Sequence, residues 1–242
     1  MRGRYCRRMR PDHTSKHFDH ALGRARELVG LMAARVERQL SDAIETLQSG
    51  SPALIAQILR HEADVNSLER AIDEYSGQII ARRHPAARDL RLVMALLGAT
   101  TDLERIGDEA KKIALYLRSI FAAGRPLLAR VLELRPMAEL VKDMLHQATR
   151  AMDSLDPQAA AELVRRDLEV NESFRAVLAR LAGLMLEDPR SISSCLDILF
   201  VAKSLERIGD HAKNLGEHVV YAAVGKDVRH ATPQEIEQVL RR

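Results

Sequence analysis

The sequence predicts an all-α protein built from two tandem, internally duplicated three-helix bundles. Three observations lead to this prediction. Strong helix formers (Ala, Leu, Arg and Glu) dominate the 242-residue chain, which contains only 12 Gly and 8 Pro. These few helix-breaking residues fall at wide intervals. Finally, the hexapeptide Leu-Glu-Arg-Ile-Gly-Asp occurs at residues 103–108 and again at residues 205–210, which is typical of a repeated structural unit.

Turn signals divide the chain into six long helices and a short last one. The signals are Ser49-Gly50-Ser51-Pro52, His84-Pro85, Gly124-Arg125-Pro126, Asp156-Pro157, Asp188-Pro189 and Gly225. A proline in the first turn, after a Ser or Asp cap, begins a helix. We therefore expect helices near 14–48, 52–83, 86–123, 126–154, 157–187 and 190–224, and a short helix from Pro233. Short connections make consecutive helices antiparallel.

The third and sixth helices carry matching apolar seams. In the third helix, apolar residues alternate at spacings of four and three from Leu92 to Leu117, and the sixth repeats the pattern from Ile198 to Val219. The repeat places the first bundle at residues 13–123 and the second at 126–225. A basic, disordered arm at 1–12 and a tail at 226–242 with the short helix flank them.

Composition and charge exclude several classes of protein. The 46% apolar content is enough for a core, and no run of 18 apolar residues is present to span a membrane. With 3% aromatic residues and no Trp, stacking on nucleic acid bases is not expected. The net charge of +3 comes from five arginines in residues 1–10. The two cysteines, Cys6 and Cys195, form no paired motif and indicate a reducing compartment.

The repeated hexapeptide places two acids on one helix face in each unit. Glu104 and Asp108 are four residues apart, as are Glu206 and Asp210, and both pairs lie away from the apolar seam. Two acids at this spacing repel each other by roughly 0.2–0.5 kcal/mol. The glycine inside each hexapeptide costs a helix about 1 kcal/mol relative to Ala, and it lets another backbone or a ligand come close. Two unfavourable choices made twice indicate a function.

The neighbouring helices should add oxygen donors at the same level. If the first hairpin turns near Pro85, Asp108 is level with Glu62 and Glu104 is level with Asn66. If the second turns near 188–189, Asp210 is level with Asp167 and Glu206 with Asn171. We expect eight metal-ligating residues in two sets: Glu62, Asn66, Glu104, Asp108, Asp167, Asn171, Glu206 and Asp210.

Ligand sets made only of oxygen suit Mg²⁺, Mn²⁺ or iron, and zinc is also compatible. The alternative is a solvated acidic face neutralised by Arg105, Lys111, Arg207 and Lys213. His61, His211 and His218 lie near the two sets and are further candidate ligands, although most such histidines are ordinary surface residues. No Glu is followed three residues later by His, which argues against a ferritin-like di-iron site.

The sequence resembles the PhoU family over about residues 13–225. The resemblance rests on the two Glu-x-x-x-Asp pairs within Leu-Glu-Arg-Ile-Gly-Asp, on Asp89-Leu90-Arg91, and on His13-Thr14-Ser15-Lys16 with Phe18. It implies two three-helix bundles with carboxylate-bound metal, often iron or zinc, on the bundle surface. The second unit departs from the pattern, with Ser191 where Asp89 would align and Lys203 in place of Thr101.

The resemblance also implies a function in phosphate signalling. Members act between the Pst phosphate transporter, through its ATPase subunit, and a PhoR-type sensor histidine kinase, and they restrain the phosphate-starvation response. They are cytoplasmic, often homodimers, and peripheral to the membrane through their partners. The leading interpretation is therefore a metal-binding signalling adaptor that is not an enzyme and does not bind nucleic acid. The alternatives are a metal-dependent hydrolase of phosphate compounds and a purely structural helical module.

Overall fold

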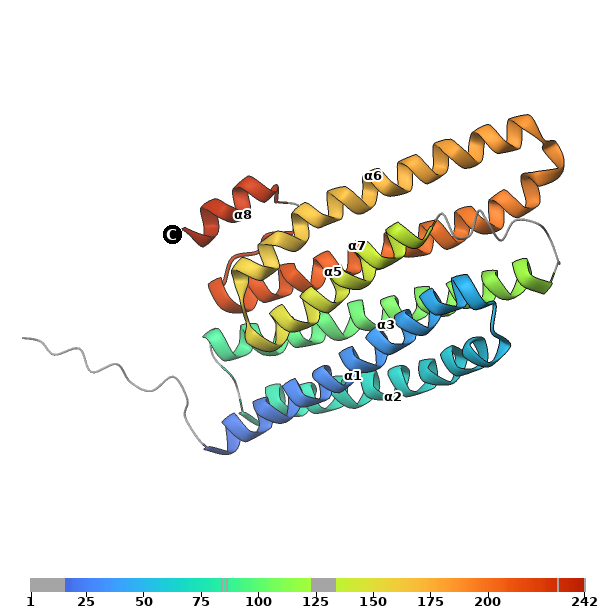
Figure 1. The fold of residues 1–242 in the computed structure, drawn as a ribbon. Helices are drawn as coiled ribbons and strands as arrows, with labels where there is room; N and C mark the ends of the chain where they lie inside the picture. The colour runs from blue at the N-terminus through green and yellow to red at the C-terminus, as the bar shows by residue number, and fades with distance from the viewer. Residues whose placement is uncertain (1–15, 84, 86, 123–133, 230, 242) are drawn as a thin grey trace, which may run out of the picture.

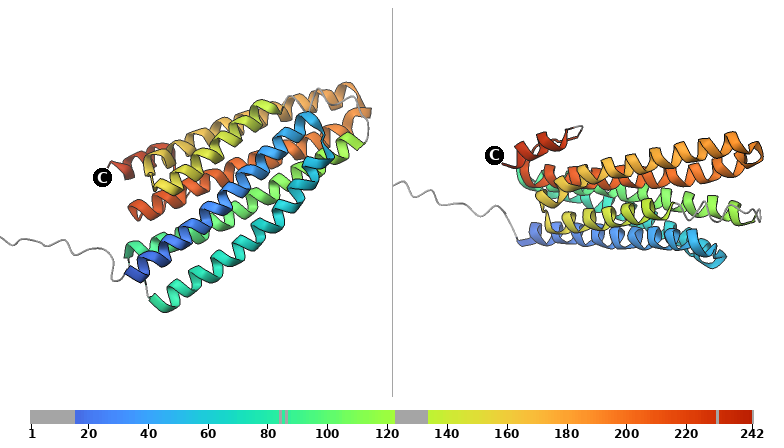
Figure 2. Two further views of the ribbon diagram at one scale, coloured as in Figure 1. Left: turned by 60° about the horizontal axis from the view of Figure 1, so that its bottom comes forward. Right: turned by 45° about the horizontal axis from the view of Figure 1, so that its top comes forward.

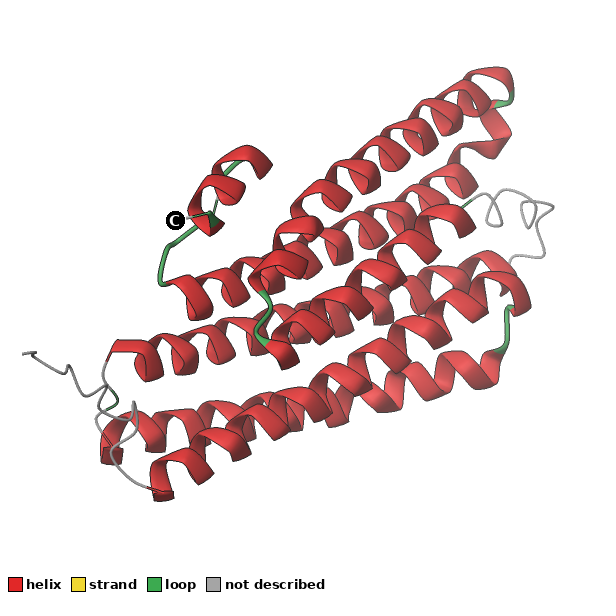
Figure 3. Cartoon of the chain, turned by 60° about the vertical axis from the view of Figure 1, so that its left-hand side comes forward, coloured by secondary structure: helices red, strands yellow, loops and turns green. Residues whose placement is uncertain are grey.

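The computed structural model describes residues 16–83, 85, 87–122, 134–229 and 231–241, and within these ranges it contains helices and short loops but no strand (Figures 1 and 3). The long helices are α1 (Lys16–Ser49), α2 (Pro52–Arg83), α3 (Ala87–Ala122), α5 (Arg135–Ser154), α6 (Pro157–Glu187) and α7 (Ile192–Val224). A 3₁₀ turn (Pro189–Ser191) precedes α7, and α8 (Pro233–Leu240) follows it. The all-α prediction is confirmed.

The predicted turn residues start and stop these helices as expected. The Asp156 side chain accepts hydrogen bonds from the backbone N–H groups of Gln158 and Ala159, at 3.0 and 3.2 Å, and so caps α6. Gly225 ends α7 with φ at 77°, a conformation in which glycine is unstrained. Thr232 and Glu235 form a reciprocal capping box at the start of α8.

Some predictions fall on residues outside the described ranges. They are the basic arm at 1–12, the boundary near Gly124, the start of the fourth helix at residue 126, and the segment His13-Thr14-Ser15. The predicted helix over 126–154 starts too early, because α5 itself begins at Arg135, after an N-cap at Leu134 and with Pro136 in its first turn.

The helices form two three-helix units that lie against each other. We call α1–α3 the first unit and α5–α7 the second unit. Within each unit every helix packs against the other two, and the most extensive contact in the molecule joins α3 to α7 across the units. Figures 1 and 2 show the long helices running along one common direction, with the first unit below the second in Figure 1.

The predicted seams of α3 and α7 form the centre of the core. Leu96, Leu103 and Ile113 on α3 are at most 2% exposed, as are Leu205 and Leu215 on α7. Burying a side chain of this size contributes about 1.5–3 kcal/mol. The buried apolar residues of both units form one continuous cluster. Helix α1 of the first unit also packs against α5 of the second unit.

Two further features complete the described fold. The short helix α8 packs against α6, where Arg165 forms an ion pair with Glu237. Within the described ranges, none of the helices combines the length and the apolarity needed to cross a bilayer.

Candidate functional site

The glycine in each repeated hexapeptide lets the neighbouring helix pack closely. A Cβ atom on Gly107 would lie 3.2 Å from Gln39 Oε1 and 3.6 Å from Val65 Cγ1, and one on Gly209 would lie 3.1 Å from Val170 Cγ1. Gln39 uses this space to donate a hydrogen bond to the Gly107 carbonyl at 3.1 Å. Both glycines therefore face packed protein side chains from the adjoining helices.

The sequence-based prediction pairs residues that are level in each antiparallel hairpin. In the structure, each glycine instead contacts a side chain two residues further along the neighbouring helix. Gly107 faces Val65 and Gly209 faces Val170, whereas level Cα atoms would place the residue two positions earlier opposite each glycine. The cause is the tilt of side chains toward the N-terminus of their own helix. In an antiparallel pair this tilt displaces the contact by about one residue on each helix. The predicted pairings change accordingly.

In the first unit this displacement brings different residues together. Glu62 contacts Lys111, not the level residue Asp108. Burial raises the pKa of Glu104 most, and the nearby carboxylates of Asp108, Glu69 and Glu62 raise it further. Asn66 is half-buried on α2, between Glu62 and Glu69. The structure therefore groups three of the four predicted residues, Glu62, Glu104 and Asp108, with Glu69, which was not predicted.

Two acids of this face were not predicted from the sequence. The pKa of Glu69 is raised by burial and by its neighbours Asp73 and Asp108. Glu69 and Asp73 are four residues apart on α2, on the stripe that begins with Glu62 and Asn66, and this periodicity is the signal that could have identified them. We call Glu62, Glu69, Asp73, Glu104 and Asp108 the first-unit acidic face.

The corresponding residues of the second unit are paired with lysines. Lys213 Nζ lies 3.3 Å from Asp167 Oδ2 and 3.4 Å from Asp210 Oδ1. Asn171 donates a hydrogen bond to Asp167 Oδ2 at 3.2 Å. Glu206 Oε2 lies 2.5 Å from Lys203 Nζ. The four predicted residues do lie in one region, but as an ion-paired network.

The donor chemistry of the first-unit acidic face fits a hard cation. Five carboxylates lie on two adjacent helices, and in the described chain one lysine, Lys111, contacts them. As the side chains lie, no three His, Cys, Asp or Glu groups among the described residues converge on one point. The metal assignment stays a prediction.

The three candidate histidines contact other acids, Asp42 and Asp102, and not the predicted metal ligands. His61 Nδ1 lies 3.8 Å from Asp42 Oδ2. His211 Nδ1 lies 2.7 Å from Asp102 Oδ1, and His218 Nε2 lies 2.9 Å from Asp102 Oδ2. The last two join α7 to α3 at the interface between the units, so they face a buried acid of α3.

Asp102 is a buried carboxylate that the sequence pattern did not identify. Burial raises its pKa, but hydrogen bonds from His211, His218 and Asn214 outweigh this effect and lower the pKa to about 2. The Asn214 amide donates to Asp102 Oδ1 at 3.1 Å. Gly98 leaves room for the His218 ring, since a Cβ there would lie 2.5 Å from the ring. This network links the two units through charge-assisted hydrogen bonds.

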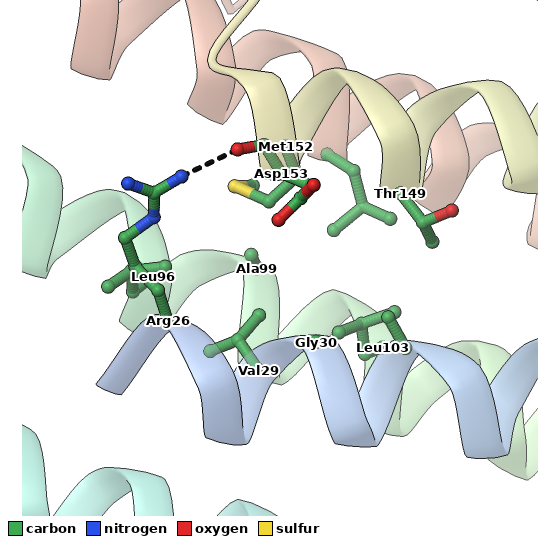
Figure 4. Close-up of a pocket in the computed structure, with 11 residues that line it drawn as sticks. Arg26, Val29, Gly30, Leu96, Ala99, Leu103, Thr149, Met152 and Asp153 are labelled. Carbon is green, nitrogen blue, oxygen red and sulfur yellow. Dashed lines mark hydrogen bonds between the residues drawn. The ribbon is translucent and has the colours of Figure 1, made fainter. Parts of the chain in front are cut away.

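A small cavity lies where α1, α3 and α5 meet (Figure 4). Its volume is about 30 Å³, and apolar side chains such as Val29, Leu96 and Met152 line it. At its edge Arg26 donates a hydrogen bond to the Asp153 carbonyl at 2.5 Å (Figure 4). A space of this size and polarity is a packing gap between the units.

Comparison with known proteins places this architecture among characterised relatives. The family model described as the PhoU domain matches twice, at residues 29–117 and 134–219. A phosphate-specific transport system accessory protein PhoU homolog from Burkholderia sp is 41% identical over 93% of this chain and 97% of its own length. The phosphate-specific transport system accessory protein PhoU of Escherichia coli (strain K12) is 37% identical over 94% of both chains. The crystal structure of PhoU from Pseudomonas aeruginosa superposes with a TM-score of 0.80 at 35% identity, and it covers 86% of this chain and 100% of that one.

Proposed function

Because this chain belongs to the PhoU family, we propose that it is an accessory regulator of phosphate uptake that restrains the phosphate-starvation response when phosphate is plentiful. The observation that supports this proposal best is the pair of family matches, at 29–117 and 134–219, which together span both units. The relatives are described as accessory proteins of the phosphate-specific transport system. The role is adaptor-like and needs no catalytic residue.

We assign this regulator two partners and a location. The partners are the ATPase subunit of a Pst phosphate transporter and a PhoR-type sensor histidine kinase. The protein would act in the cytoplasm as a homodimer and reach the membrane through these partners. The transport-system description of the relatives supports the first partner, and the resemblance of the repeated motifs supports the second and the dimer.

The first-unit acidic face is the proposed cation site. Its five carboxylates come from α2 and α3, and burial and mutual repulsion raise the pKa values of Glu69 and Glu104. A bound Mg²⁺, Mn²⁺, iron or zinc ion supplies positive charge that turns this repulsion into a cross-link between the two helices. In the second unit, Asp167, Glu206 and Asp210 already contact lysines, so a cation there must displace a lysine.

The geometry gives less support to a metal-dependent hydrolase. Such an enzyme needs a general base beside its metal-bound water. In the described part of the chain, His211 and His218 hydrogen-bond to Asp102 at the interface between the units. An assay of phosphomonoester hydrolysis with added Mn²⁺ separates the two functions, and we expect no turnover.

Gene deletion tests the proposed function. We expect deletion to raise the output of a phosphate-controlled reporter in phosphate-rich medium and the wild-type gene to restore repression. The double variant Glu104→Gln, Asp108→Asn should restore it incompletely. A matched control is the α5 control pair, Glu139 and Asp143, which has the same Glu-x-x-x-Asp spacing on another helix. Reporter output that deletion leaves unchanged would contradict the assignment.

A further inference from the structure

Three positions beside the acid pairs differ between the two units. Gly107 facing Val65 and Gly209 facing Val170 are equivalent contacts, so α7 aligns with α3 at an offset of 102 and α6 aligns with α2 at an offset of 105. Among the residues of the two acidic faces and their contacts, this alignment gives three changes of charge: Glu69 becomes Phe174, Asp73 becomes Leu178, and Thr101 becomes Lys203. Two carboxylates are lost in the second unit and one ammonium group is gained.

Lys203 is held against the acid pair of the second unit. Its Nζ atom lies 2.5 Å from Glu206 Oε2 and 5.4 Å from the centre of the Phe174 ring. The Glu206 side chain is 12% exposed, so this ammonium group neutralises a carboxylate that water reaches poorly. Phe174 packs against the core and offers its ring face to the cation. The residue that replaces Glu69 therefore positions the lysine that replaces Thr101.

The other charged groups of the two faces are equivalent. Lys111 contacts Glu62 in the first unit as Lys213 contacts Asp167 in the second. The arginines also correspond, Arg70 with Arg175 and Arg105 with Arg207. The first-unit face thus has five carboxylates and one lysine, whereas the second has three carboxylates (Asp167, Glu206 and Asp210) and two lysines. The three exchanged residues account for this difference.

We infer that the second unit is a lysine-neutralised copy of the cation site, in which Lys203 occupies the place of a metal and Phe174 and Leu178 replace two carboxylates, so that metal binding is confined to the first unit. This inference rests on the cation binding proposed above. An ammonium group tethered to the same helix is present at high effective concentration. A divalent cation must displace it and also bind without the two carboxylates that Phe174 and Leu178 replace.

The number of bound Mn²⁺ ions, measured by equilibrium dialysis of the full chain, tests the inference. We expect the wild-type protein to bind Mn²⁺ and the double variant Glu104→Gln, Asp108→Asn to bind none. The double variant Glu206→Gln, Asp210→Asn should bind Mn²⁺ with an affinity within twofold of the wild-type value. The triple variant Phe174→Glu, Leu178→Asp, Lys203→Thr restores the first-unit residues and should add a second class of Mn²⁺ site. Lys203→Arg keeps the cation and is the matched control, which should add none.

The outcomes separate this inference from the proposed function. Equal loss of Mn²⁺ from both double variants would overturn the inference and leave metal binding intact. Absence of Mn²⁺ binding by the wild type would overturn the proposed metal site. The triple variant then decides the inference: Mn²⁺ binding by it and not by Lys203→Arg supports lysine neutralisation, and no binding by either overturns it. If the triple variant does not fold, the two double variants decide.

Discussion

Replacing Asp102 with Asn tests the network that joins the two units. The amide has nearly the shape of the carboxyl group but lacks its charge, so the variant mimics protonated Asp102. The pKa of Asp102 is lowered from 3.8 to about 2. One pKa unit corresponds to about 1.4 kcal/mol, so the charged form stabilises the fold by about 2 kcal/mol at neutral pH. We expect Asp102→Asn to lower the free energy of unfolding by about that amount.

The pH dependence of this difference identifies its cause. Because the folded-state pKa of Asp102 lies below its unfolded value of 3.8, its stabilisation is complete well above pH 3.8 and is lost as the pH falls toward 2. The groups facing it across the interface are His211, His218 and Asn214 of α7. The difference between wild type and Asp102→Asn should therefore be constant from pH 7 to 5 and fall to about half by pH 3.

Urea unfolding followed by circular dichroism at pH 7, 5 and 3 measures this difference. A suitable control is Asp143→Asn, which removes an exposed carboxylate of α5 and should change the free energy of unfolding by less than about 0.5 kcal/mol. Equal stability of Asp102→Asn and wild type at pH 7 would refute the reasoning. So would a difference of the same size at pH 3 as at pH 7.

Three further predictions concern the glycines and the first-unit acidic face. Gly216→Ala should destabilise the protein by about 1–3 kcal/mol, because its Cβ would lie 2.8 Å from Leu163. Gly77 has open space around it, so Gly77→Ala should stabilise the protein by about 0.5–1 kcal/mol. Thermal melts that rank the two variants in the opposite order would contradict this. Mn²⁺ at a hundredfold excess over Kd should stabilise the wild type by about 2.7 kcal/mol. Glu104→Gln with Asp108→Asn should lose that gain, the α5 control pair should keep it, and a gain retained by both would contradict the site. Because the pKa of Glu104 is raised in the fold, its ionisation costs stability above its unfolded pKa and the cost disappears as the pH falls through the raised value. Glu104→Gln should therefore raise Tm at pH 7 in EDTA but not near pH 4, and a lower Tm at pH 7 would contradict the repulsion.

The part of this site that the sequence predicted depends on short-range periodicity. The pairs Glu104 with Asp108 and Glu206 with Asp210 share helix faces because residues four apart are neighbours on any α-helix. Their recurrence in two identical hexapeptides established the duplication. Glu69 and Asp73 follow the same rule on α2 and were accessible to the same argument, but they lie outside the repeated hexapeptide and were missed.

The sequence by itself determined the helices, their order and the duplication, because capping, turn formation and the apolar seam all act within a few residues. Tertiary structure decided which side chains meet across helices. The tilt of side chains paired Lys111 with Glu62, and the packing of α3 against α7 brought His211 to Asp102, 109 residues away along the chain. It also placed Lys203 over Phe174. Such contacts depend on rotamers and on the relative placement of helices, which arise only when the whole core packs.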